Sequence, residues 1–265
     1  MAGHFYPADA RELSQMVEKF LAEVDAEAPP ARAAMAPHAG LVYSGQCAAH
    51  VFKRVKIPAI AVIIAPNHTG RVGAPGGASL WSRGAFQTPL GDVAVAQAFA
   101  TELEQRSALV AHDPVAHRQE HAIEVELPFI STLAPQTAIV PIVLAFDDWK
   151  SCGQLATDLA RLVAEWPEDV LLIASSDMTH FESAASAERK DSIALAAVER
   201  LNGEELLAAC RRERISMCGR GPAAVVVEAA HQLGATQAQV VDYRHSGWVT
   251  RDDSSVVAYA GVLIA

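Results

Sequence analysis

The chain has 265 residues, of which 51% are hydrophobic, and its formal net charge at pH 7 is −10. This acidic balance, without a long Lys/Arg run, argues against a nucleic-acid partner, because such binding depends on clustered cations that neutralise phosphates. No apolar run reaches the about 18 residues of a membrane span and no signal-peptide pattern opens the chain, so we expect a cytoplasmic protein.

Predicted helices and strands alternate along the chain. Apolar residues recur at helical spacing, and the helices expected from this are Ala8–Val24, Asp92–Gln105, Arg118–Leu133, Cys152–Trp166, Ala184–Leu201 and Gly221–Leu233. Buried strands are expected at Ala33–Ala36, Ala59–Ala65, Thr137–Leu144, Val170–Ala174, Gln239–Tyr243 and Val256–Leu263. The stretch 26–32 is expected to be a loop. The alternation predicts one α/β domain over residues 1–265, with a mostly parallel or mixed central sheet and helices on both faces.

Polar residues follow three of the predicted strands. His38 and His68 each come shortly after a strand, and Asp177 and His180 follow a third. Because ligands bind beyond the carboxyl ends of the strands in open α/β sheets, we expect these side chains to share one pocket. A single histidine at such a position could equally cap a turn or bond a backbone carbonyl, but three together favour a site.

Cys218 is the cysteine placed for chemistry. The other cysteines, Cys47, Cys152 and Cys210, fall in apolar helical stretches, and there is no CxxC pair that would suggest a zinc knuckle. Cys218 stands before an apolar helix and near Arg220, so we expect its thiol to ionise more easily than a free thiol. The alternative is an inert buried thiol.

A further cluster lies between His117 and Glu124. His117 and His121 are four residues apart, and His121 and Glu124 are three apart, so each pair could share one face of a helix. A solvated, charged start of a helix is the alternative. The sequence contains no G-x-G-x-x-G, Walker A or G-x-S-x-G motif, so nucleotide binding and serine-hydrolase chemistry have no local support.

Several segments, in order from one end of the chain to the other, together resemble one family. They are Ala2–Asp9, Ala36–Gly40 with Tyr43–Gly45, Ala65–Gly70, Glu120–Phe129, Ser175–Asp177 with His180, Cys218–Arg220 and Asp253–Val256. With these segments the chain resembles the Memo family, whose bacterial and archaeal members are called AmmeMemoRadiSam system protein B. That family in turn resembles in fold the class III extradiol dioxygenases, which are non-haem iron enzymes.

The resemblance implies a metal centre. By it, His38 and His68 match the two metal-ligand histidines, Cys218 takes the third ligand position, and His180 matches the acid/base histidine. A thiolate thus replaces the carboxylate of the iron(II) oxygenases, so dioxygenase activity does not simply carry over. We expect one divalent transition metal. The resemblance favours Fe(II), while the softer thiolate suits zinc or copper.

Asp177 and His121 would line the same pocket. Asp177 is expected to fix the tautomer of a ligand imidazole or of His180, with turn capping as the alternative.

The leading function is a metal-dependent, dioxygenase-like oxidoreductase acting on a small aromatic or oxygen-rich substrate, with His180 as general acid/base. Two alternatives are a non-catalytic metal-binding or phosphopeptide-binding signalling protein, and a redox sensor that uses Cys218. The expected partner is a small-molecule substrate or a peptide, without nucleic acid or membrane. A homo-oligomer is possible.

Overall fold

The computed structural model describes residues 1–25 and 31–265, so most of the loop predicted over 26–32 lies outside the described residues. The strands are β1 (Ala33–Ala36), β2 (Ile60–Pro66), β3 (Ala78–Leu80), β4 (Ala85–Thr88), β5 (Gly91–Ala94), β6 (Val110–His112), β7 (Ala138–Leu144), β8 (Val170–Ser175), β9 (His180–Glu182), β10 (Ala238–His245) and β11 (Val256–Ile264). The helices are α1 (Ala10–Ala22), α2 (Leu41–Phe52), α3 (Gln97–Arg106), α4 (Pro114–His117), the 3₁₀ turn η1 (Glu124–Glu126), α5 (Leu127–Leu133), α6 (Trp149–Glu165), α7 (Ala184–Glu199), α8 (Gly203–Arg212), α9 (Arg220–Gln232) and α10 (Gly247–Thr250).

The central sheet is mixed, with parallel strands at its middle. Its order is β10-β11-β1-β8-β2-β7-β3-β6, with β9 paired to β11 and a separate β4–β5 hairpin. β1, β8, β2 and β7 run parallel to one another, whereas β11 lies antiparallel to β1 and β3 antiparallel to β7. The prediction of a mostly parallel or mixed sheet with helices on both faces is therefore confirmed.

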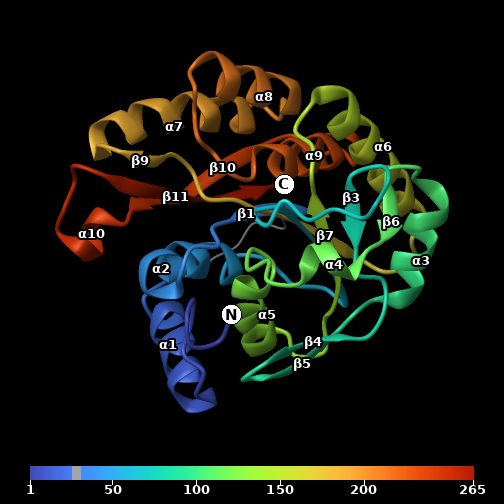
Figure 1. The fold of residues 1–265 in the computed structure, drawn as a ribbon, viewed down its shortest axis with the longest axis horizontal. Coiled ribbons are helices and arrows are strands. Elements are labelled where there is room, and N and C mark those ends of the chain that lie inside the picture. The colour runs from blue at the N-terminus through green and yellow to red at the C-terminus, as the bar shows by residue number, and fades with distance from the viewer. Residues whose placement is uncertain (26–30) are drawn as a thin grey trace.

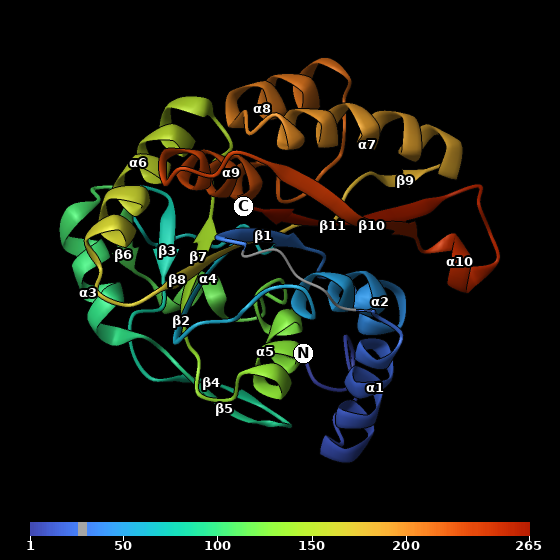
Figure 2. The same cartoon turned by 180° about the vertical axis from the view of Figure 1, so that it is seen from behind.

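Two hydrophobic clusters cover the two faces of this sheet. One joins the sheet to α3, α6, α7, α8 and α9, and the other joins it to α1, α2 and α5. Figures 1 and 2 show the same two layers from opposite sides. In the second cluster, Phe52 of α2 stacks on Phe129 of α5 with ring centroids 5.3 Å apart. The parallel strands are therefore covered by helices on both faces.

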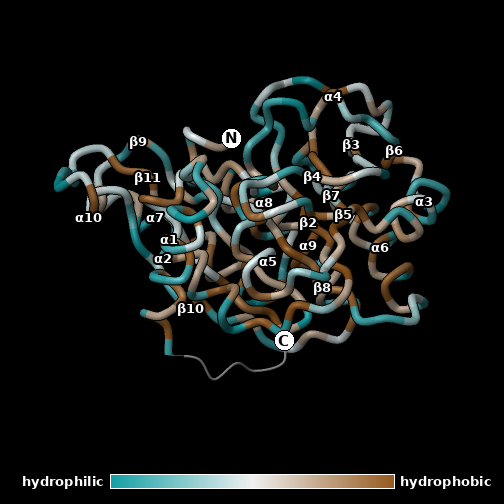
Figure 3. The backbone as a smooth tube through the Cα atoms, turned by 90° about the horizontal axis from the view of Figure 1, so that it is seen from below, coloured by the Kyte–Doolittle hydropathy of each residue, from teal (hydrophilic) through white to brown (hydrophobic). Residues whose placement is uncertain are grey.

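Hydrophobic residues are concentrated on the central strands, and hydrophilic residues colour many of the outer loops (Figure 3). Strands β2 and β8 read as continuous apolar runs because both of their faces are covered. Among the described residues, no helix combines the length and the apolar character needed to cross a membrane.

The helix predicted over Arg118–Leu133 is wrong in its first half. Gln119 has a φ of +68°, and the chain becomes helical only at η1 and α5. The Glu120 carboxylate accepts hydrogen bonds from the backbone N–H groups of His121 and Ala122, and this forms a turn instead of a helix. The predicted helix over Asp92–Gln105 is also shortened, because its first residues belong to β5.

The register of the parallel strands sets up the site. Ala36 of β1 pairs with Ser175 of β8, and two residues further on lie His38 and Asp177. β2 lies on the other side of β8 and is followed by His68. Residues from three distant segments therefore meet at one edge of the sheet.

Candidate metal centre

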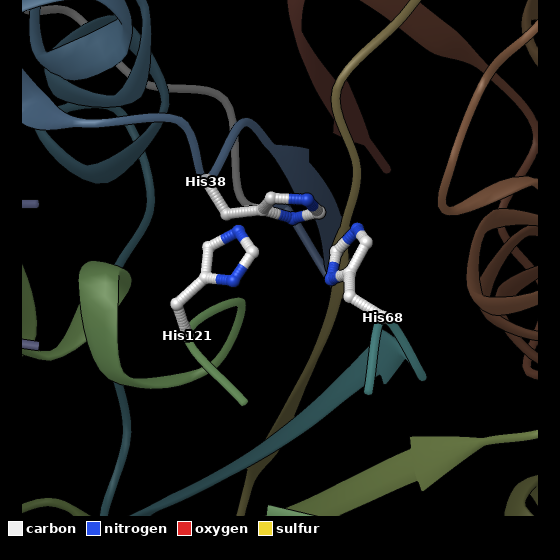
Figure 4. Close-up of side chains that lie close together, drawn as sticks. All are labelled: His38, His68 and His121. Carbon is white, nitrogen blue, oxygen red and sulfur yellow. The ribbon is translucent and has the colours of Figure 1, made fainter. Parts of the chain in front are cut away.

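Three histidines lie close together beyond the carboxyl ends of β1 and β2. His38, His68 and His121 each offer a ring nitrogen, and these atoms all lie within 4.8 Å of one another. The ring centroids are 5.1 Å apart for His38 and His68, 5.4 Å for His38 and His121, and 4.7 Å for His68 and His121. Figure 4 shows the three rings meeting from separate segments of the chain. This group could bind a metal ion.

His38 is buried, and its tautomer follows from its hydrogen bonds. Its Nδ1 lies 2.7 Å from the hydroxyl of Ser175, which itself donates to the carbonyl of Ala122 at 2.7 Å. Since the hydroxyl proton is used in that bond, Nδ1 of His38 must donate, and its Nε2 keeps a free lone pair. Burial and the nearby His68 lower the pKa of His38 to about 3, which keeps the ring neutral at pH 7.

Glu120 orients His68 and was not predicted from the sequence. Its Oε1 accepts from Nδ1 of His68 at 2.9 Å, and its Oε2 accepts from the His68 backbone N–H at 2.6 Å. Burial alone would raise the pKa of Glu120, but the hydrogen bonds from His68 and neighbouring N–H groups outweigh it and lower this pKa to about 2. An ionised carboxylate can only accept, so Nδ1 of His68 carries the proton and its Nε2 is free.

His121 is the least tightly hydrogen-bonded of the three histidines. Its Nδ1 lies 3.4 Å from Oε1 of Glu120, longer than the Nδ1 contacts of His38 and His68. Burial and the nearby His38 lower the pKa of His121 to about 4, so it too is neutral at pH 7. The sequence placed His121 in the pocket wall, and the structure brings its ring into the ligand group itself.

Cys218 lies beside this group, two residues before the start of α9. Its Sγ is 3.3 Å from Nε2 of His38. Two ligands of one tetrahedral ion, with typical metal–sulfur and metal–nitrogen bond lengths, lie about 3.5 Å apart. Cys218 and His38 therefore already stand at a separation that suits a shared ion.

Gly219 allows the segment that holds Cys218 to approach β8 closely. A Cβ at Gly219 would lie 2.4 Å from the carbonyl oxygen of Ser175, which no side chain could tolerate without a shift. The backbone N–H of Gly219 also donates to Ser176 Oγ at 3.0 Å. The glycine thus fixes the distance between Cys218 and the end of β8.

The expectation that the Cys218 thiol ionises easily is wrong. Burial and the nearby Asp177 raise the pKa of Cys218 well above its ordinary value. The guanidinium of Arg220, expected to lower it, is paired with Asp147, with Nε 2.6 Å from Oδ2. Without a metal, Cys218 and His38 form a neutral thiol–imidazole pair.

Asp177 contacts the backbone of the His38 loop. Its Oδ1 accepts from the N–H groups of His38 at 2.8 Å and of Ala39 at 3.3 Å. This is the capping role that the sequence left as the alternative, whereas Ser175 and Glu120 hold the imidazole tautomers. Burial raises the pKa of Asp177, while the His38 N–H bond opposes that shift.

His180 begins β9, near the ligand group but outside it. Its Nδ1 donates to the carbonyl of Met178 at 2.7 Å, and its backbone N–H donates to Ser216 Oγ at 2.8 Å. Because Nδ1 is engaged, Nε2 is the free nitrogen. His180 follows Asp177, whose carboxylate bonds the backbone of the His38 loop, by three residues.

His117 and Glu124 are not part of the ligand group, and the helix that would have aligned His117 with His121 and His121 with Glu124 does not form. Nε2 of His117 lies 3.0 Å from the carbonyl of Ser79, and its ring contacts Trp81 and Phe86. Glu124 accepts a hydrogen bond from the hydroxyl of Tyr6. The turn at Glu120 removes the helix that would have aligned these residues.

The buried His117 should make the stability of the fold depend on pH. Burial lowers its pKa to about 4, whereas in an unfolded chain a histidine titrates near pH 6.5. Between these values the unfolded chain binds the proton and the folded chain does not, so the free energy of unfolding decreases as pH falls from about 6.5 to 4. We expect His117→Gln to reduce this slope by up to about 1.4 kcal/mol per pH unit. Urea titrations of the metal-free protein across this range measure it, and an unchanged slope would contradict it.

A cavity of about 250 Å³ opens beside Cys218. Its walls include Asn67, Phe146, Asp147, Cys218 and Gly221, at the ends of β2 and β7 and the start of α9. This space lies where α/β sheets bind their ligands, and it suits a molecule smaller than a drug-sized ligand.

Comparison with known proteins gives a consistent result over the whole chain. The family model described as "Memo-like protein" matches residues 1–263. A MEMO1 family protein of Aquifex aeolicus is 40% identical over 269 residues, covering 99% of this chain and 97% of that protein. Another, from Methanocaldococcus jannaschii, is 36% identical over 282 residues, covering 100% of this chain and 97% of its own.

Among solved structures, an uncharacterized protein of Escherichia coli K12 is similar with a TM-score of 0.56 and 14% sequence identity. The similarity covers 87% of this chain and 98% of that chain. At this identity it supports the fold alone.

Proposed function

This chain belongs to the Memo family, and from that starting point we propose that it is a metal-dependent, dioxygenase-like oxidoreductase whose ion is held by His38, His68 and Cys218. The ring of His121 lies in the same group and could supply a further nitrogen ligand. The proposed substrate is a small aromatic or oxygen-rich molecule that occupies the cavity beside Cys218.

The observation that carries the proposal is the way in which the imidazoles are held. In His38 and His68 the Nδ1 proton is bonded to a hydroxyl or a carboxylate, which leaves Nε2 free to bind an ion. Metal-ligating histidines are usually oriented in this way by a second hydrogen bond. The ring nitrogens of these two histidines and of His121 lie within 4.8 Å of one another, and the Cys218 thiol is 3.3 Å from Nε2 of His38.

A bound divalent ion would act as a Lewis acid that polarises a substrate oxygen. The protein's own side chains would transfer protons and position the ligands. His180 has a free Nε2 and can carry a proton to or from the substrate, while Asp177 keeps the His38 loop in place. The donor set of two imidazoles and a thiolate suits zinc or copper by softness, and the resemblance to extradiol dioxygenases favours Fe(II).

The alternatives have weaker support. A redox sensor needs a thiolate that forms easily, and the raised pKa of Cys218 opposes this in the metal-free protein. A phosphopeptide-binding role would call for a cluster of unpaired basic side chains near the cavity, but Arg220 is already paired with Asp147.

The proposal is tested by the metal content and turnover of the same preparation. We expect about one transition-metal ion per chain in protein purified without added metal, and oxygen uptake with Fe(II) and a panel of catechols. Full occupancy without turnover of any diol or other oxygen-rich substrate would favour a non-catalytic metal protein. Peptide binding that is insensitive to metal removal would contradict the proposal.

Glu120 provides a separate prediction about the metal. We expect Glu120→Gln to weaken metal affinity by about 10- to 100-fold, the usual effect of removing a carboxylate that orients a ligand histidine. The glutamine amide can no longer serve as a charged acceptor for Nδ1 of His68 and for the nearby N–H groups. Competition against a chromophoric chelator measures the affinity.

Asp113→Asn is a matched control, because the buried Asp113 carboxylate likewise accepts hydrogen bonds from backbone N–H groups, those of Gly73 and Ala74, but lies outside the ligand group. Equal losses in the two variants would contradict the specific role of Glu120.

A further inference from the structure

The N-terminal turn lies against the ligand group. Gly3 N–H donates to the carbonyl of Tyr6 at 2.8 Å, which closes a compact turn. The N-terminal amine of Met1 lies 3.0 Å from Oε1 of Glu124 in η1, the turn that follows the His121 segment. Ala2, Gly3 and His4 are exposed, but Phe5 is half-buried and Tyr6 is buried. The turn therefore directs its two aromatic residues inward.

The ring of Phe5 stacks on the ring of His121. Their centroids are 4.2 Å apart and the planes differ by 19°. His68 also stacks on His121, with centroids 4.7 Å apart and an angle of 23°. Two rings at these distances cannot share one face of a third, so His121 is held between Phe5 and His68.

This stacking replaces the hydrogen bond that orients the other two histidines. His38 and His68 have Nδ1 partners at 2.7 and 2.9 Å, whereas Nδ1 of His121 is 3.4 Å from Glu120 Oε1. An imidazole without a good hydrogen bond at Nδ1 is free to exchange tautomers and to rotate about its broad χ2 torsion. The contact with Phe5 restricts that rotation.

Phe5 is itself anchored on both sides of the centre. Its carbonyl accepts the N–H of Leu41 at 2.8 Å, which ties it to the segment that follows His38. The hydroxyl of the adjacent Tyr6 donates to Glu124, three residues beyond His121. The turn thus bridges the two segments that carry His38 and His121.

We propose that Phe5 is a positioning residue of the metal centre, and that its ring keeps His121 oriented with a nitrogen towards the ion site. This inference rests on the proposed metal-binding function. This role would account for the N-terminal segment Ala2–Asp9, which resembles the family but contributes none of the proposed metal ligands.

The test compares Phe5→Leu, which removes the ring and keeps apolar volume, with Phe5→Tyr, which keeps the ring. We expect Phe5→Leu to weaken Co²⁺ binding about 3- to 10-fold, as loss of one aromatic pair predicts, and to alter the visible cobalt spectrum. Phe5→Tyr should bind within about 2-fold of the wild type, since the stacking contact is retained. Phe86→Leu is the matched control, because Phe86 also contacts a histidine, His117, outside the centre.

A double-mutant cycle separates positioning from a general loss of structure. In a His121→Ala background, Phe5→Leu should produce no further loss of cobalt affinity. Fully additive effects, or wild-type cobalt binding by Phe5→Leu, would overturn the inference.

The metal-free protein gives a second readout. NMR relaxation of the His121 ring should show more ring motion in Phe5→Leu than in the wild type, because the stacking contact that restricts rotation is lost. If wild-type protein bound no cobalt, the proposed function would fail, and the NMR comparison alone would still decide whether Phe5 orients His121.

Discussion

Replacing His68 by alanine is expected to weaken metal binding by about 10²-fold or more. Structural zinc sites with four protein ligands bind with free energies of about 10–16 kcal/mol, so one ligand accounts for a share of about 3 kcal/mol. The His68 ring also donates from Nδ1 to Oε1 of the buried Glu120 carboxylate, and His68→Ala removes this partner while the backbone N–H bond to Oε2 stays. Elemental analysis and chelator competition on the purified variant measure the loss. His68→Ala with undiminished metal would refute the ligand assignment.

The same measurement decides which residue completes the ligand set. Sγ of Cys218 lies 3.3 Å from Nε2 of His38, so we expect Cys218→Ala to lose nearly as much metal as His68→Ala. His121→Ala should lose less, because its nitrogen lacks the tight Nδ1 hydrogen bond of the other histidines. The reverse order would make the centre a three-histidine site with Cys218 outside it.

His180→Ala is expected to lower turnover by about 10²- to 10⁴-fold while metal content stays nearly complete, the usual result when a general acid or base is removed. His180 lies outside the ligand group, and its backbone rather than its ring bonds to Ser216 near Cys218. The ring can therefore be removed without disturbing the metal ligands. Rate and metal stoichiometry must be measured on one preparation.

Two outcomes would contradict this role. Loss of metal from His180→Ala as severe as from His68→Ala would make His180 a ligand. Full turnover in His180→Ala would remove it from the proton transfer. Ser216→Ala serves as a control for the position of β9, because Ser216 Oγ accepts the His180 backbone N–H at 2.8 Å but has no contact with its ring nitrogens.

The sequence was sufficient for the family and the fold class. Apolar runs identified β1, β2, β7 and β8, and their alternation with helices predicted the parallel centre. A strand that is buried on both faces is a continuous apolar run, and such a run can be identified from the sequence without tertiary information. The ends of these strands then predicted that His38, His68 and Asp177 would converge. The resemblance to the Memo family, confirmed over residues 1–263, rested on ordered motifs in the sequence.

Short or irregular elements were not predicted. Strands β3, β6 and β9 are held by pairing with strands distant in sequence, so their own residues carry little periodic signal. The β4–β5 hairpin pairs locally, but each of its strands has only four residues, too few for a clear alternation. The turn at Glu120 depends on a buried carboxylate that binds backbone N–H groups, and such hydrogen bonds compete with helix formation. A helical pattern of charges could not reveal it.

The sequence by itself thus determined the family and the central sheet, because these follow from local patterns along the chain, whereas the structure added His121 to the group with His38 and His68. Only the tertiary structure decided which tautomer each histidine adopts and whether the Cys218 thiol is protonated. The partner of the His68 ring is 52 residues away in sequence, and the partner of the His38 ring is 137 residues away. The easily ionised thiol expected at Cys218 proved neutral for the same reason, since burial and the pairing of Arg220 with Asp147 set its pKa. Tautomers and pKa values depend on burial and on partners brought together by folding, and neither can be found in the order of residues alone.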